Sequence, residues 1–241
     1  MTDNTMTDRH TLHSFDEDIK ALSDEIINLS EQVANELQQA LSALRAGDHA
    51  AAERVVESDH LADALQDKIN AHTTRALTRQ QPLARDLRAI LAASRIAPHL
   101  ERIGDYAKNT AKRTQRLSQP IDAELAGRFH WMGTRIISML HRVTDAYVKQ
   151  DAQLANVAWT DDAELDAVYA GLFKYLLQAM CADSRRVADG SQLLFIAKGL
   201  ERAGDHVTDI AEEVHLMVTG SPLSGPRPKV DEMGTTTSPR I

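Results

Sequence analysis

Four pairs of acidic residues, each with a spacing of four, are the feature of this sequence best suited to chemistry. Residues four apart share a face of a helix, and like charges at that spacing destabilise a helix by about 0.2–0.5 kcal/mol per pair. A bound cation is the simplest compensation, because oxygen ligands suit hard ions such as Mg²⁺, Mn²⁺ or iron. The sequence therefore predicts metal ligands, and no catalytic residues, at Asp59, Asp63, Glu101, Asp105, Asp162, Asp166, Glu201 and Asp205.

These acids leave the apolar stripe of their helices. Counted from Leu100, Glu101 and Asp105 fall at about 100° and 140°, whereas the apolar residues of that segment stay within about 60°. The segment around Glu201 shows the same pattern. We therefore expect the carboxylates on the flank or outer face of each bundle, where acids from two helices with axes about 8–10 Å apart hold a small cation cluster across a groove. The alternative is an ordinary solvated acidic face.

Two Glu-x-x-His patterns suggest a different class of protein. They are Glu57-Ser-Asp-His60 and Glu212-Glu-Val-His215, and this pattern supplies ligands in ferritin-like di-iron proteins. A di-iron oxidase requires four helices to converge inward, so the distance between the two patterns decides this alternative. The other histidines, His99 and His206 among them, are interpreted as surface residues. The sequence has no glycine-rich phosphate loop and no nucleophile elbow.

The second half of the chain repeats the first. Asp59-His-Leu-Ala-Asp63 matches Asp162-Ala-Glu-Leu-Asp166 at an offset of 103 residues, and Glu101-Arg-Ile-Gly-Asp105 matches Glu201-Arg-Ala-Gly-Asp205 at an offset of 100. Gly104 and Gly204 lie inside these motifs, where close helix packing explains a glycine best. Pro98 should kink its helix, whereas its counterpart Lys198 should not.

The elements that position these motifs are six predicted helices. Capping residues, prolines and glycines place them at residues 14–47, 48–79, 82–117, 121–149, 151–187 and 190–220. Short connections make sequential helices antiparallel neighbours. The fold class is therefore all-α, with two pseudo-symmetric three-helix bundles at 14–117 and 121–220. Residues 1–13 and 221–241 are predicted to be disordered.

Composition excludes several functions. The 241 residues carry a formal net charge of −8, and their basic residues are scattered rather than clustered, which argues against nucleic-acid binding. The single cysteine, Cys181, excludes an intramolecular disulfide and a cysteine-based zinc site. No signal peptide is recognisable at the N-terminus, and no apolar run approaches the ~20 residues that a membrane-spanning helix needs.

The two Glu-Arg-x-Gly-Asp motifs resemble the repeated signature of the PhoU family. The resemblance extends over Glu101–Asn109 and Glu201–Asp209, includes Arg85-Asp-Leu-Arg88 and the two Asp pairs, and covers residues 14–220. One departure is Asp209, which stands where the family usually has Asn.

The resemblance implies a function that composition does not. PhoU-like proteins are cytoplasmic negative regulators of phosphate uptake and phosphate-starvation signalling, and they are not enzymes. They connect the ATPase of a phosphate ABC transporter to a phosphate-sensing histidine kinase, associate with the inner membrane through these partners, and often form homodimers. Family members bind clusters of iron, zinc or other metal ions on acidic motifs. A ligand-free helical scaffold is the remaining alternative.

Overall fold

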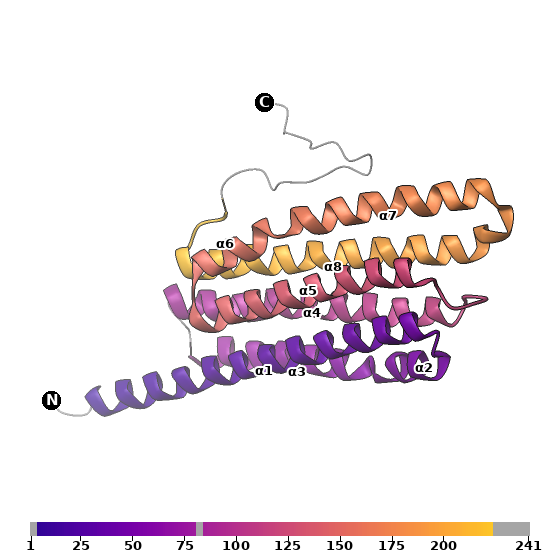
Figure 1. Cartoon of the computed structure of the whole chain (residues 1–241). Coiled ribbons are helices and arrows are strands. Elements are labelled where there is room, and N and C mark those ends of the chain that lie inside the picture. The colour runs from indigo at the N-terminus through magenta and orange to yellow at the C-terminus, as the bar shows by residue number, and fades with distance from the viewer. Residues whose placement is uncertain (1–3, 81–83, 224–241) are drawn as a thin grey trace.

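The computed structural model describes residues 4–80 and 84–223, and this part of the chain is helical without a β-strand (Figure 1). No helix within it is long and apolar enough to span a bilayer. Its elements are α1 (Asn4–Ala46), α2 (His49–Ser58), α3 (His60–Gln80), α4 (Ala84–Thr114), α5 (Ala123–Lys149), α6 (Ala152–Thr160), α7 (Asp162–Ala182), the 3₁₀ turn η1 (Ser184–Arg186) and α8 (Val187–Thr219).

The six predicted helices are present, but the second and the fifth are each interrupted. The breaks separate α2 from α3 at Asp59 and α6 from α7 at Asp161, so the prediction of one continuous helix at each place is wrong. The carbonyl of Asp59 still accepts from the Asp63 amide at 3.4 Å. Each break places the first acid of a pair at the start of a new helix, where the helix dipole favours a negative charge.

Most helix ends follow the predicted capping signals. Asp48, Asp122 and Asp151 accept hydrogen bonds from the first-turn amides of α2, α5 and α6. Gly47 and Gly220 adopt positive φ angles of 63° and 75°, a conformation that glycine reaches without steric strain.

Two starts differ from the prediction. Helix α1 begins at Asn4 rather than at Ser14, because no glycine or proline interrupts the segment between them. Helix α8 begins at Val187 and includes Gly190, where a Cβ would overlap Met180. The predicted helix start at Pro82 and the predicted disordered tail beyond residue 223 lie outside the described residues.

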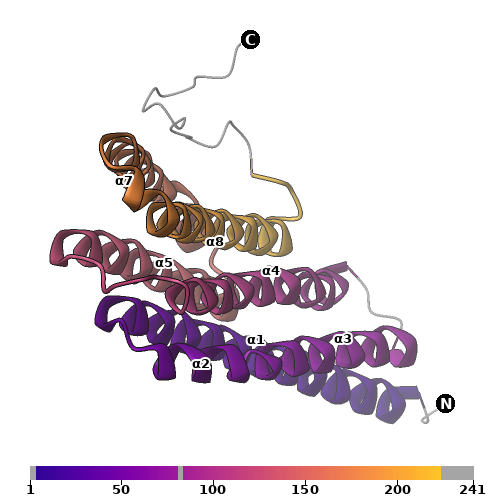
Figure 2. The same ribbon diagram turned by 90° about the vertical axis from the view of Figure 1, so that its right-hand side faces the viewer.

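The two repeats are joined by two pairs of equivalent helices. Helices α1, α2, α3 and α4 pack together, as do α5, α6, α7 and α8, and the repeats meet where α1 contacts α5 and α4 contacts α8. Figure 2 shows α3 and α7 on opposite outer sides of this arrangement. At the α1–α5 contact, Leu41 occupies the space that a side chain at Gly133 would need, and Ser30 and Thr144 share a hydrogen bond of 2.8 Å. One apolar core therefore runs through both repeats.

Candidate functional site

Two acids of the first repeat share one ammonium group. Lys108 on α4 donates to Asp59 Oδ2 at 2.6 Å and to Asp105 Oδ1 at 3.1 Å. Burial opposes the charge on Lys108, but its hydrogen bonds with the two carboxylates outweigh burial and raise its pKa above the usual value. The Lys108 ammonium thus connects an acid at the α2–α3 junction with an acid on α4.

Three further carboxylates complete this first acidic face, which consists of Glu36, Asp59, Asp63, Glu101 and Asp105. The pKa of Glu101 is raised by burial, then by the neighbouring charges of Asp105 and, more weakly, Asp63. Asp63 and Glu101 therefore feel each other's charge. The four acids predicted for the first repeat are thus linked through Lys108 and through the charge effects on Glu101.

Glu36 on α1 is a member of this face that sequence reasoning missed. Its side chain is only 2% exposed, and Gln32 donates to its Oε1 at 2.8 Å. Burial is the main cause that raises the pKa of Glu36 to about 7; the Gln32 hydrogen bond lowers it, and the charges of Asp59 and Asp63 raise it further. The available signal was its place on the apolar stripe, three residues after Val33 and four before Ala40.

The second acidic face, formed by Asp162, Asp166, Glu201 and Asp205, is more deeply buried. Asp162 is 1% exposed and Asp166 is 5% exposed, so the prediction that all eight acids lie outside the core is wrong for these two. Asp59, at 8%, is likewise buried. The cause is close helix approach: a Cβ on Gly204 would stand 2.8 Å from Asp162 Oδ1 and would overlap the Leu165 side chain.

Each face has one lysine of its own, at positions that do not correspond between the repeats. On the second face, Lys198 Nζ lies 3.0 Å from Glu201 Oε1 and 5.1 Å from the centre of the Tyr169 ring. At the 100-residue offset, Lys198 matches Pro98 and Lys108 matches Thr208. Each repeat thus has a lysine among its acids, but at a different position of the repeat.

The contribution of the first helix of each repeat also differs. Helix α1 supplies the carboxylate of Glu36, whereas α5 supplies two arginines. Arg135 lies 3.2 Å from Asp161 and 3.0 Å from Glu164, and Arg142 binds the other oxygen of Asp161. The first face therefore has one carboxylate more than the second, and Arg102 lies near Glu101 and Asp105.

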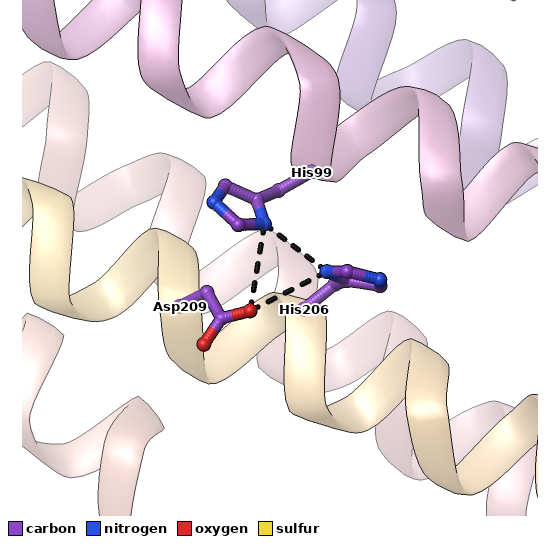
Figure 3. A group of neighbouring side chains, drawn as sticks. All are labelled: His99, His206 and Asp209. Atoms are coloured by element: carbon purple, nitrogen blue, oxygen red, sulfur yellow. Dashed lines mark hydrogen bonds and ion pairs between the residues drawn. The ribbon is translucent and has the colours of Figure 1, made fainter.

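The tightest group of possible metal ligands is elsewhere. Among the described residues, one group of three such side chains has its ligand atoms all within 4.8 Å of one another, namely His99, His206 and Asp209 (Figure 3). The eight predicted carboxylates do not form such a group. His99 and His206 are half-buried between α4 and α8, so the prediction that they are surface residues is wrong.

The di-iron alternative fails on distance. Glu57 and His60 lie on α2 and at the start of α3, whereas Glu212 and His215 lie on α8, and neither α2 nor α3 contacts α8 in the described structure. Figure 2 shows α2 and α8 on different sides of the molecule. His60 Nδ1 instead contacts the Glu57 carbonyl oxygen of its own turn at 2.6 Å.

Two tandem three-helix units with matched acidic faces define this chain as a repeated all-α protein. Comparisons with known proteins identify its family. The PhoU domain family matches residues 26–114 and 129–214. This chain belongs to the PhoU family.

Relatives of known name cover nearly the whole chain. The phosphate-specific transport system accessory protein PhoU homolog of Xylella fastidiosa (strain 9a5c) is 38% identical over 95% of this chain and 96% of its own length. The protein of the same name from Rhizobium meliloti (strain 1021) is 36% identical over 95% of this chain and 98% of its own length. The crystal structure of PhoU from Pseudomonas aeruginosa superposes with a TM-score of 0.81 at 28% identity, covering 86% of this chain and all of that one.

Proposed function

We propose that this protein is an accessory regulator of phosphate transport that keeps phosphate uptake and phosphate-starvation signalling low when phosphate is plentiful. The observation that carries the proposal is the family match, which includes both repeats and both Glu-Arg-x-Gly-Asp motifs. Relatives named as accessory proteins of phosphate-specific transport match along nearly their entire lengths, which supports the same role for this chain. The protein acts as a cytoplasmic regulator rather than as an enzyme.

The partners in this proposal are the ATPase of a phosphate ABC transporter and a phosphate-sensing histidine kinase. The protein joins them as an adaptor at the inner membrane, alone or as a homodimer. Direct phosphate sensing is the less favoured route, because both marked faces are acidic and anion sites need helix N-termini or arginine clusters. Partner contact is therefore the proposed means of signal transfer.

Metal binding on the acidic faces is a second part of the proposal. The first face offers five carboxylates, from α1, α3, α4 and the α2–α3 junction, and burial, followed by neighbouring negative charges, raises the pKa values of Glu36 and Glu101. Hard divalent or iron-type ions suit such oxygen ligands. An incoming ion must displace Lys108 or bind beside it, so a ligand-free scaffold with internal lysine counterions remains the competing hypothesis.

Deletion of the gene tests the regulatory role. Alkaline phosphatase activity should rise in cells grown with abundant phosphate, and the wild-type gene supplied on a plasmid should restore repression. Affinity capture of the tagged protein from the same cells should recover the transporter ATPase and the histidine kinase. Normal repression in a deletion strain without a second copy of the gene would overturn the proposal.

A further inference from the structure

A His–His–Asp cluster joins the two repeats at the contact between α4 and α8. His99 extends from α4, and His206 and Asp209 extend from one face of α8 toward it (Figure 3). The two Nδ1 atoms lie 3.1 Å apart, and Asp209 Oδ2 lies 3.5 Å from the Nδ1 of His99 and 3.4 Å from that of His206. Three ligand atoms thus form a nearly equilateral triangle.

The size of this triangle matches zinc coordination. Zinc binds histidine nitrogen and carboxylate oxygen at about 2.0–2.2 Å, so two ligands of a tetrahedral site are about 3.3–3.5 Å apart. An octahedral ion at similar bond lengths would bring its ligands to about 3 Å. The two distances from Asp209, 3.5 and 3.4 Å, match the tetrahedral spacing, and the 3.1 Å between the two histidine nitrogens lies between the two spacings. We propose that His99, His206 and Asp209 bind a zinc-like transition-metal ion that clamps the first repeat to the second.

The surroundings favour a cation and hold the ligands in place. Burial lowers the pKa of His99, and the negative charge of Asp209 opposes this shift. The Tyr106 ring stacks on the His206 ring at 6.0 Å between centroids. Such packing limits the number of orientations that the His206 ligand can adopt.

Two outer carboxylates lie near the cluster and are already engaged. The negative charges of Glu213 and Glu212 both raise the pKa of His99. Glu212 accepts from Trp159 Nε1 at 2.9 Å, and Glu213 pairs with Arg95 at 3.3 Å. They add negative potential without occupying the metal position. Because the side chains of His99, His206 and Asp209 are 28%, 23% and 41% exposed, the fourth position of a tetrahedral ion is open to water.

The other copy of this crossing is an internal comparison. At the 100-residue offset, His99 matches Gly199, His206 matches Tyr106, and Asp209 matches Asn109. There Tyr106 packs toward Gly199, so that a Cβ on that glycine would stand 3.4 Å from Tyr106 Cδ1. The pseudo-symmetric position has no imidazole or carboxylate, so one ion per chain is expected at the α4–α8 contact.

Zinc titration of the full chain, freed of metal with a chelator, tests this site. Millimolar Mg²⁺ is kept present to occupy the all-carboxylate faces, since imidazole favours zinc over magnesium. One zinc ion per chain should bind, and Co²⁺ in its place should show the intense visible absorption of a tetrahedral site. His99→Gln and Asp209→Asn should each weaken zinc binding by about 100-fold or more, beyond the loss typical of outer-shell partners.

The matched control is His141→Gln, since His141 is an exposed histidine on α5. This variant should bind zinc as the wild type does. Circular dichroism of each variant confirms folding, so a loss of binding is assigned to the ligand. Zinc affinity unchanged in His99→Gln, or absence of one-to-one zinc binding in the wild type, would overturn the site and would leave only a histidine–histidine hydrogen bond there. Neither result bears on phosphate regulation, which the deletion strain tests separately.

Discussion

Replacing Glu36 by Gln tests the electrostatics of the first acidic face. In the folded protein the pKa of Glu36 is raised from 4.5 to about 7, chiefly because the side chain is buried. Between these two values the folded state keeps a proton that the unfolded chain has lost. The free energy of unfolding therefore falls as pH rises from 4.5 to about 7 and stays lower above that range.

The expected magnitude follows from the shift. One pKa unit corresponds to about 1.4 kcal/mol, so ionised Glu36 destabilises the fold by about 3 kcal/mol above pH 7 and by less than about 1 kcal/mol at pH 5. Gln has nearly the same shape and no charge. Glu36→Gln should therefore be more stable than the wild type at pH 8, and this gain should exceed the gain at pH 5 by about 2–3 kcal/mol.

Urea unfolding at about pH 5 and pH 8, with a chelator present, measures this difference. Glu31→Gln is the matched control because Glu31 is an exposed glutamate of the same helix, and its effect should be within about 0.5 kcal/mol at both pH values. If Glu36→Gln changes the stability by the same amount at both pH values, Glu36 does not titrate in this range and the inferred rise of its pKa by burial is wrong. If it destabilises the protein at pH 8, the favourable contacts of the carboxylate, such as the hydrogen bond from Gln32, outweigh the cost of burying its charge.

Three further predictions concern packing and cation binding. Gly204→Ala should lower the free energy of unfolding by about 1–3 kcal/mol, because the added Cβ overlaps side chains of α7. The control Gly127→Ala has open space around it and should be neutral or stabilise the protein by up to about 1 kcal/mol. Thermal unfolding compares the two variants. Lys108→Met should destabilise the chelated protein by about 1–3 kcal/mol, and Mn²⁺ should restore more stability to it than to the wild type; equal Mn²⁺ effects would show that the lysine does not hold a cation position. Asp63→Ala combined with Asp105→Ala should reduce the metal content of the first repeat by elemental analysis while the fold persists, and unchanged metal content would place the ligands elsewhere.

Local signals predicted the architecture well. The all-α class and the caps Asp48 and Asp151 depend on residues close together in the sequence, and the internal repeat is found by comparing the sequence with itself, so all of them can be recognised without a structure. The helix breaks at Asp59 and Asp161 have no glycine or proline to mark them. They become visible only when α3 and α7 pack against their neighbours, since tertiary contacts decide where a weak helix boundary falls.

The membership of the site was harder to predict. A helical wheel shows which residues share a face of one helix, and it placed the acids of α4 and α8 correctly beside the apolar stripe. It cannot show that Gly204 admits Asp162 into the core, or that Glu36 from α1 reaches the face formed by α3 and α4. It also cannot show that His99 meets His206, since these residues are 107 positions apart.

The two repeats share some features of their acidic faces and differ in others. They share the acidic pairs and the glycine of each motif, which determine how α3 packs on α4 and how α7 packs on α8. They differ in the lysine that lies among the acids and in the side chains where α4 crosses α8. Helices α4 and α8 cross near the pseudo-twofold axis, so a residue of α4 there meets a residue of α8 that is not its own repeat counterpart. One histidine on each helix, His99 and His206, therefore makes a ligand pair, and the equivalent pair, Gly199 and Tyr106, has none. A metal ion at this crossing would link the two acidic faces, because α4 contributes two acids to the first face and α8 contributes two acids to the second.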